Sequence, residues 1–175
     1  MTKGIMIFET PRLYVRLLKL DDLEAMHEMQ SDEEVMRYTS QRAAMTRAET
    51  LAELTDLMTR YEQPDNDFWV WAVARREDSA FVGTCALIIN EAGEQEIGYR
   101  CLRKFWGKGY GLEMILGLNA YAFDELGLES LAAYVFSDNT ASVRILEKAG
   151  YQLEKEFFNE EEQCMDKIYR IYRRT

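Results

Sequence analysis

Apolar and polar residues recur along this chain with two periods, and the change from one period to the other predicts its secondary structure. Residues 9–18 open with a proline and then alternate apolar with polar positions, which indicates a strand beginning near Arg12. Asp21 and Glu24 form a capping pair, so we expect a helix from there to about Gln30.

A second helix follows after an irregular segment. Thr46 and Glu49 form a capping box, and the apolar residues after it recur at helical spacing as far as Tyr61. Residues 32–45, between the two helices, are polar and show neither period, so we expect irregular structure there. Residues 63–67 contain a proline and break the second helix.

Four strands are predicted in the middle of the chain. Residues 68–74 are apolar at both alternating positions, which is typical of an interior strand covered on both faces. Residues 80–89 and 96–102 follow after short turns, so the three segments form an antiparallel meander. A helix then leads into a strand over residues 130–136, which we expect to run parallel to the strand over residues 96–102.

The last part of the chain predicts a helix and a closing hairpin. Ser137 to Thr140 supply the cap of this helix, and Gly150 ends it. Residues 151–158 and 164–173 pair across an acidic turn. The expected fold class is α+β, a single domain over residues 1–175 with a mixed, mostly antiparallel sheet of about seven strands and about four helices.

Three alternating glycines stand between a predicted strand and a predicted helix. Gly107, Gly109 and Gly111 lie in the stretch 103–114, and the helix after them is apolar almost all round. Glycine lets the backbone approach a ligand closely, and the first amides of a helix are unpaired and electropositive. The pattern therefore favours a phosphate-binding loop over a merely tight connection. It matches neither a Walker loop nor a dinucleotide fingerprint, which needs a small residue at Leu112.

Composition and charge narrow the classes of function. Of the 175 residues, 47% are hydrophobic and 30% are charged, with no apolar run long enough to span a membrane. The net charge of −10 argues against nucleic acid as a direct partner and is compatible with a cationic amine substrate. Three unclustered cysteines favour reduced cytosolic thiols and no metal site. His27, the single histidine, is expected to be a surface or packing residue.

The glycine stretch resembles the acyl-coenzyme A loop of the GNAT superfamily of N-acetyltransferases, Gln/Arg-x-x-Gly-x-Gly/Ala. Trp106 stands at the Gln/Arg position of that pattern. The forms Trp-Gly-x-Gly-Tyr and, near the N-terminus, Glu-Thr-Pro-Arg-Leu resemble the branch that acetylates ribosomal proteins at an N-terminal alanine or serine. The resemblance implies that acetyl-CoA is the cosubstrate and that the loop holding it consists of Gly107, Lys108, Gly109, Tyr110, Gly111 and Leu112.

Residues 139–151 resemble the other GNAT motif, Asn-x-x-Ala/Ser-x-x-x-Tyr/Leu-Glu-Lys-x-Gly-Phe/Tyr. The resemblance implies that Asn139 and Ser142 line the cofactor groove, with Asn139 on the pantetheine arm. Many family members carry a tyrosine at the position of Leu146, where it protonates the departing thiolate, so this acid is missing here. Ser142 is the candidate replacement. Solvent is the alternative, because a thiolate of pKa about 8.5 leaves readily near neutral pH.

The family fold also implies a splayed sheet. The strand over residues 96–102 is expected to separate from that over residues 130–136 and to leave a slot between them. In this slot pantetheine would pair with free backbone groups near Cys101 and Leu102. An amide there would stabilise the thioester oxygen as charge develops on it. Glu96 is the candidate general base, directly or through water; otherwise it is a solvent-facing strand residue.

Further polar side chains are expected at the slot. The sequence does not identify the acceptor amine. Tyr99 and Tyr134 lie on the two strands that form the slot. The implied reaction is direct acetyl transfer to a primary amine, either a protein N-terminus or a small molecule, by a cytoplasmic monomer or homodimer. Residues 32–45 and 159–163 are expected to determine which acceptor amine is used. A non-catalytic acyl-CoA-binding module is the alternative function, since Leu146 replaces the usual acid.

Overall fold

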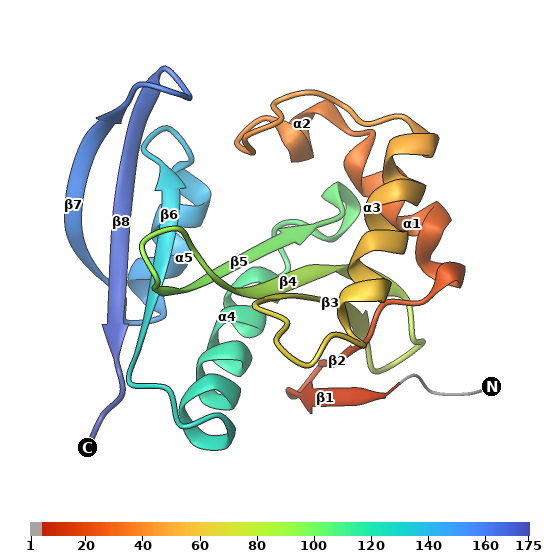
Figure 1. Ribbon diagram of the computed structural model, residues 1–175, viewed down its shortest axis with the longest axis horizontal. Coiled ribbons are helices and arrows are strands. Elements are labelled where there is room, and N and C mark those ends of the chain that lie inside the picture. The colour runs from red at the N-terminus through yellow and green to blue at the C-terminus, as the bar shows by residue number, and fades with distance from the viewer. Residues whose placement is uncertain (1–4) are drawn as a thin grey trace.

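The computed structural model describes residues 5–175 and contains one mixed sheet with helices on both faces (Figure 1). Eight strands are hydrogen-bonded in the order β1-β2-β3-β4-β5-β6-β8-β7. The strands are β1 Met6–Glu9, β2 Leu13–Arg16, β3 Phe68–Arg75, β4 Phe81–Ile89, β5 Gln95–Cys101, β6 Ser130–Phe136, β7 Gln152–Asn159 and β8 Cys164–Tyr172. The α-helices are α1 Leu23–Gln30, α2 Glu33–Met36, α3 Arg47–Arg60, α4 Tyr110–Ala120 and α5 Thr140–Lys148.

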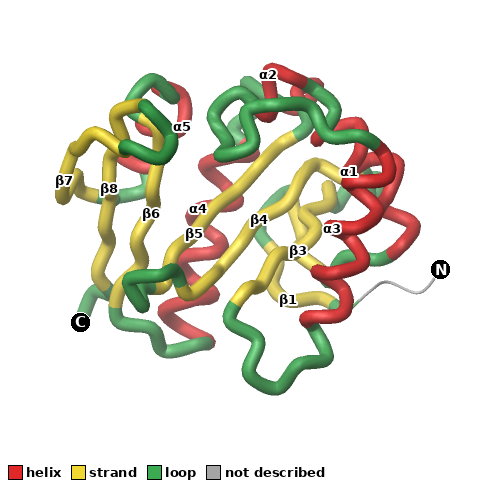
Figure 2. Tube along the Cα trace, turned by 45° about the horizontal axis from the view of Figure 1, so that its top comes forward, coloured by secondary structure: helices red, strands yellow, loops and turns green. Residues whose placement is uncertain are grey.

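The sheet divides into two arms at the contact between β5 and β6. The larger arm consists of β1 to β5, and the smaller arm consists of β6, β8 and β7. These two strands run parallel, as predicted, and are in register through a single pair, Glu96 with Ala132. By contrast, β4 pairs with β5 all the way from Ile89 to Gly83, and β6 pairs with β8 over its whole length. Beyond the shared pair β5 and β6 diverge, as Figure 2 shows, so their facing backbone groups lack a strand partner.

Two apolar clusters hold the helices against the larger arm. On one face of the sheet, Met114, Ile115 and Leu118 of α4 are fully buried against side chains that include Trp71 and Val73 of β3. On the other face, Leu54 and Leu57 of α3 pack with residues of α1 and with Ala72. Because β3 is covered on both faces, its nearly continuous apolar sequence is explained, and the predicted interior strand is confirmed.

The N-terminal region differs from the prediction in three respects. β1 is an eighth strand that the sequence pattern did not indicate, because it is short and lies at the edge of the sheet. The segment expected to be irregular contains the short helix α2. The predicted cap by Asp21 and Glu24 is wrong: Asp22 accepts from the Lys19 amide and pairs with Arg16, where both side chains are buried.

Other predicted boundaries agree closely with the structure. Thr46 and Glu49 form both bonds of the capping box at the start of α3. Asn139, within the predicted cap segment, is the N-cap of α5 and accepts from the Ser142 amide at 3.3 Å. Gly150 follows α5 with φ +94°, the left-handed conformation expected of a helix stop. These ends are set by local hydrogen bonds, which is why the sequence predicted them.

Candidate active site

The slot between the arms exposes one edge of β5. The Leu102 amide donates to Val82 O at 2.9 Å, so it is committed to the β4 side. Backbone groups of successive strand residues point to opposite edges, which places the N–H and C=O of Cys101 on the β6 side. Trp106 Nε1 donates to Cys101 O at 3.0 Å, in agreement with that direction. Of the two amides that the sequence suggested for the thioester oxygen, that of Leu102 is therefore excluded and that of Cys101 is retained.

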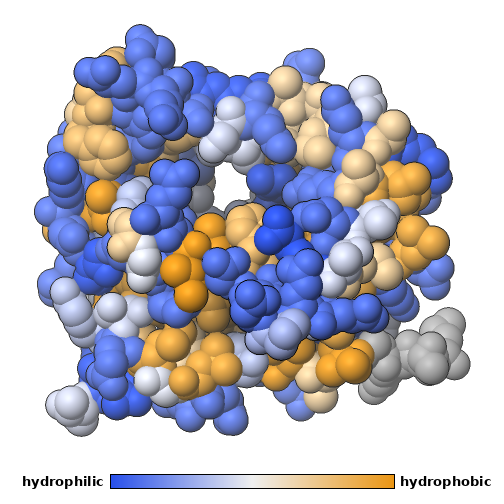
Figure 3. Space-filling model, viewed as in Figure 1, coloured by the Kyte–Doolittle hydropathy of each residue, from blue (hydrophilic) through white to orange (hydrophobic). Residues whose placement is uncertain are grey.

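An opening passes through the molecule at this slot, beside β5, in the space-filling view of Figure 3. Arg42, in the segment after α2, contacts residues of the smaller arm. Its guanidinium lies 5.0 Å from the ring centre of Phe136, donates to the backbone carbonyl of Glu162, and has Nε 3.8 Å from the Glu162 carboxylate. The arms are thus joined at the β5–β6 pair and again through Arg42, and the slot has a closed rim.

The glycine loop leads from β5 into α4 with two residues in left-handed backbone conformations. Gly107 has φ +73° and Gly109 has φ +81°, values that residues other than glycine rarely adopt. Gly109 is the N-cap of α4 and forms no side-chain cap bond, so the first amides of this helix are left for an external acceptor. A Cβ on Gly111 would lie 3.0 Å from Ile145 Cδ1 and 3.2 Å from Tyr99 Cε2, so the loop is packed closely against the slot.

Tyr99 and Ser142 come together on the α5 side of β5. Their hydroxyl oxygens are 3.0 Å apart, and the same tyrosine ring contacts the α4 N-terminus. Burial raises the pKa of Tyr99 to about 12, so the phenol keeps its proton at neutral pH. Leu146, which stands at the tyrosine position of the motif that residues 139–151 resemble, is buried in the apolar core. The structure therefore places a phenol beside Ser142 from another element.

Glu96 lies at the base of the slot, where β5 and β6 are still paired. Alternation along β5 directs its side chain to the face opposite that of Tyr99. Burial and, secondarily, the nearby charge of Glu94 raise the pKa of Glu96 from 4.5 to about 7, although a hydrogen bond from Asn90 acts in the opposite direction. A carboxyl with that pKa is half ionised near neutral pH, which suits a general base.

Glu94 is held quite differently from Glu96, although it is two residues away. It accepts from the Tyr134 hydroxyl at 2.6 Å and pairs with Arg170, which also pairs with Glu154. These hydrogen bonds lower the pKa of Glu94. The negative charge that raises the pKa of Glu96 is thus fixed in place by partners on β6 and β8.

Several sequence expectations concern groups outside the slot. His27 lies on α1, and its Nδ1 is buried with no hydrogen-bond partner among the described residues. In residues 5–175 no three side chains of His, Cys, Asp or Glu gather as metal ligands would. None of the helices in the same part of the chain is long and apolar enough to cross a bilayer.

Comparison with known proteins identifies the family. Residues 12–152 match the model described as "Acetyltransferase (GNAT) domain". The chain belongs to the GNAT acetyltransferase family. It is 31% identical over 150 residues to the uncharacterized N-acetyltransferase YoaA of Bacillus subtilis, a match covering 85% of this chain and 84% of that protein. The protein is accordingly an acetyl-CoA-dependent N-acetyltransferase.

Solved GNAT structures with different acceptors share this fold. The ribosomal L7/L12 α-N-protein acetyltransferase RimL, in complex with coenzyme A, superposes with a TM-score of 0.81 at 13% identity, covering 95% of this chain and 97% of RimL. Spermidine N-acetyltransferase from Vibrio cholerae, in complex with CoA and spermine, gives a TM-score of 0.75 at 23% identity, covering 91% of this chain and 95% of that chain. At these identities the likeness establishes the fold and leaves the acceptor open.

Two features of the candidate site were not predicted from the sequence. Tyr99 was expected near the slot, but its pairing with Ser142 depends on how α5 packs against β5. The contact of Arg42 with Glu162 joins segments 120 residues apart, which no local pattern indicates. A positively charged side chain in a polar segment carries no signal of its partner, so tertiary structure was needed for both.

Proposed function

We propose that this GNAT enzyme transfers acetyl from acetyl-CoA directly to a primary amine, a protein N-terminus or a small molecule, in a ternary complex. The observation that carries the proposal is the arrangement at the slot. Glu96 lies on one face of β5, and the Tyr99–Ser142 pair lies on the other, with the Cys101 amide facing the gap between the strands. A base and an acid on opposite sides of one slot suit an acyl transfer between two substrates.

Each group has a defined part in the proton balance. Glu96 accepts a proton from the ammonium form of the acceptor, directly or through water, so that the nitrogen lone pair can attack the thioester carbonyl. The Cys101 N–H stabilises the oxygen that gains charge. As the C–N bond forms, the nitrogen loses a second proton to solvent; as the C–S bond breaks, Ser142 or Tyr99 donates a proton to the leaving sulfur, and solvent then restores the hydroxyl and takes the proton from Glu96.

The glycine loop supplies the cosubstrate site in this proposal. Left-handed backbone at Gly107 and Gly109 and the uncapped start of α4 fit a pyrophosphate, because both present backbone N–H groups to an anion. Asn139 Oδ1 accepts the hydrogen bond that caps α5. The rest of the Asn139 side chain remains to contact a pantetheine arm. We expect the enzyme to act in the cytoplasm, as a monomer or homodimer.

The proposal is tested by measuring thiol release from acetyl-CoA across a panel of amines. The panel includes spermidine, single amino acids and short peptides with alanine or serine at the N-terminus, with peptides blocked at the N-terminus as controls. Amine-dependent release with acetylated product supports the proposal. Tight coenzyme A binding by calorimetry without release for any amine would instead support a non-catalytic acyl-CoA-binding module.

A further inference from the structure

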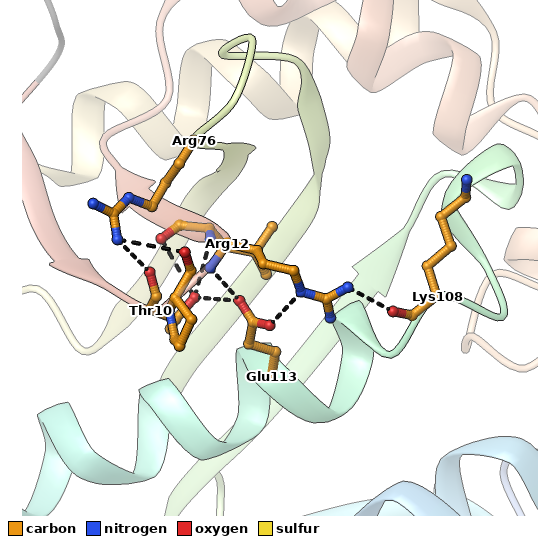
Figure 4. Close-up of polar contacts among 7 residues, drawn as sticks. Thr10, Arg12, Arg76, Lys108 and Glu113 are labelled. Carbon is orange, nitrogen blue, oxygen red and sulfur yellow. Dashed lines mark hydrogen bonds and ion pairs between the residues drawn. The ribbon is translucent and has the colours of Figure 1, made fainter.

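Arg12 lies in the β1–β2 corner, residues 10–12 between the two strands. Its side chain connects this corner to the glycine loop and to the first turn of α4 (Figure 4). Its Nη1 donates to Lys108 O at 2.9 Å, and its Nε donates to Glu113 Oε1 at 2.8 Å. The other oxygen of Glu113 accepts from the Arg12 backbone amide at 2.9 Å and from the Thr10 hydroxyl at 2.6 Å. One carboxylate therefore fixes both the backbone and the guanidinium of Arg12.

The guanidinium lies against three consecutive loop residues. Besides donating to Lys108 O, it stacks over the ring of Tyr110 at 4.5 Å, and a Cβ built on Gly109 would be 3.3 Å from its Nη2. Glu113 is the better shielded partner, with 15% of its side chain exposed against 46% for Arg12. Burial by itself would raise the pKa of Glu113, but the hydrogen bonds from Thr10 and Arg12 outweigh it and the pKa is lowered.

The bond to Lys108 O has a consequence for the next amide. A peptide unit is planar and trans, so the C=O of Lys108 and the N–H of Gly109 point in opposite directions. Holding the carbonyl toward Arg12 turns the Gly109 N–H away from the β1–β2 corner. Glycines with positive φ are otherwise conformationally free, and ordering such a loop on ligand binding costs entropy. Because Arg12 already fixes the Lys108–Gly109 peptide, less conformational entropy is lost when the loop binds a ligand.

We propose that Arg12 is a positioning residue for the pyrophosphate site, acting by orienting the Lys108–Gly109 peptide, with Glu113 holding the guanidinium in place. The inference rests on the proposed function of the loop as the coenzyme A site. It extends that function to the N-terminal corner of the chain, which lies outside the loop itself. Arg12 acts on the ligand through the peptide and not through its own charge.

Arg76 provides a matched control at the same corner. Its Nη1 donates to Thr10 O at 3.0 Å, and its Nε lies 3.8 Å from Glu9, but it has no hydrogen bond to the glycine loop or to Glu113. Arg76 is also similarly exposed, with 48% of its side chain accessible. Replacing Arg76 removes an arginine from this corner without touching the Lys108–Gly109 peptide.

The test measures coenzyme A affinity by calorimetry for the wild type and for Arg12→Ala, Arg12→Lys, Glu113→Gln and Arg76→Ala, after circular dichroism shows each to be folded. We expect Arg12→Ala to weaken coenzyme A binding roughly ten- to a hundred-fold, since one prearranged hydrogen bond in a ligand loop is worth about that much. Arg12→Lys, which retains the charge but not the two-pronged contact, is expected to recover only part of the loss. Arg76→Ala is expected to bind like the wild type.

Two further measurements separate positioning from other roles. The loss of kcat/KM in Arg12→Ala should be larger with acetyl-CoA than with S-acetylpantetheine, which lacks the pyrophosphate; an equal loss with both means general damage and overturns the proposal. Glu113→Gln should bind coenzyme A more weakly, because the guanidinium is no longer fixed. If Arg12 instead contacts phosphate directly, this variant binds more tightly, since a competing negative charge is gone.

The outcomes also distinguish this inference from the proposed function. Wild-type affinity retained in Arg12→Ala overturns the positioning role while leaving the coenzyme A site intact. A wild-type protein that binds no coenzyme A overturns the loop assignment and the positioning role together. Should Arg12→Ala fail to fold, Arg12→Lys and Glu113→Gln decide the question by the same comparison.

Discussion

At the residue scale, Glu94 and Glu96 show how environment gives two identical side chains different properties. Hydrogen bonds from Tyr134 and Arg170 lower the pKa of Glu94, whereas burial and the charge of Glu94 raise that of Glu96 to about 7. Two carboxyl groups with pKa values displaced in opposite directions commonly divide their roles in enzymes. Here the first is a fixed charge and the second is the group able to exchange a proton near neutral pH.

The first prediction concerns Glu96 as the base. Glu96→Gln should lower kcat by about 100- to 10,000-fold, the usual contribution of a general base. In the wild type, kcat should rise with pH through about 7, because the protonated carboxyl cannot accept a proton. This limb should be absent from the residual activity of the variant. Glu91→Gln, in the exposed turn before β5, is the control; an unchanged pH profile in Glu96→Gln contradicts the assignment.

Stability measurements test the same pKa independently of activity. Between its unfolded value of 4.5 and its folded value of about 7, Glu96 binds more protons in the folded chain, so rising pH destabilises the fold across this window. Glutamine does not ionise. The melting temperature of Glu96→Gln relative to wild type should therefore increase from about pH 5 to about pH 8. A difference that is constant with pH would show that the folded-state pKa is not raised.

The second prediction concerns protonation of the leaving thiolate. If Tyr99 and Ser142 act as one unit, Tyr99→Phe and Ser142→Ala should each slow the chemical step about ten- to a hundred-fold, roughly 1.4–2.7 kcal/mol of barrier. The double variant should be little worse than either one. Single-turnover rates at saturating acetyl-CoA measure the step, with the exposed Tyr172→Phe as control. Unchanged rates in both single variants mean that solvent protonates the thiolate.

At the element scale, the proposed cosubstrate site is built from β5, the glycine loop and α4. The strand supplies a free edge, the loop supplies left-handed backbone, and the helix supplies unpaired amides. α4 is anchored by fully buried Met114, Ile115 and Leu118, so its N-terminus is held rigidly relative to the sheet. A rigid helix start is useful here, because backbone donors stabilise an anion best when they need not reorganise.

The third prediction uses two glycines with similar backbone conformations. Gly109 has φ +81° and Gly93, in the β4–β5 turn, has φ +76° with no atoms within reach of a Cβ. Alanine at either position should destabilise the fold similarly, by about 1–2 kcal/mol for left-handed backbone. Coenzyme A affinity, measured by calorimetry, should fall only in Gly109→Ala. Equal affinity of the two variants would contradict the phosphate-loop assignment.

At the scale of the whole molecule, the two arms of the sheet form a ring with an opening. The arms are joined by the β5–β6 pair and again by the contacts of Arg42 with Phe136 and Glu162. The N-terminal and C-terminal parts of the chain thereby meet over the slot. We expect the acceptor to reach Glu96 through this opening, in which case the Arg42 side chain would restrict the size of the amine.

The fourth prediction tests this rim. Arg42→Ala should raise kcat/KM for a bulky amine relative to a small one by roughly ten-fold, because a steric barrier of that kind is worth one to a few kcal/mol. Arg37→Ala is the control, since Arg37 lies in the same segment but pairs with Glu34 and stacks on Tyr38. A ratio that changes equally in both variants would show a general effect of the segment, with no specific rim at Arg42.

The sequence alone determined the features that depend on neighbouring residues. The capping box at Thr46, the interior character of β3, the position of the glycine loop between β5 and α4 and the stop at Gly150 were all predicted correctly, because each rests on local hydrogen bonding, backbone preference or periodicity. The family motifs implied the splay between β5 and β6. They also directed attention to Glu96 and Ser142 before any contact was known.

Only the tertiary structure decided which distant groups meet. The phenol beside Ser142 comes from β5, the pKa of Glu96 is set by burial and by Glu94, and Arg12 reaches a loop 96 residues further along the chain. It also removed the Leu102 amide from the site by pairing it with Val82. Such contacts arise from the packing of separate elements, and packing depends on the whole set of side chains that fill the core, so no local pattern specifies it.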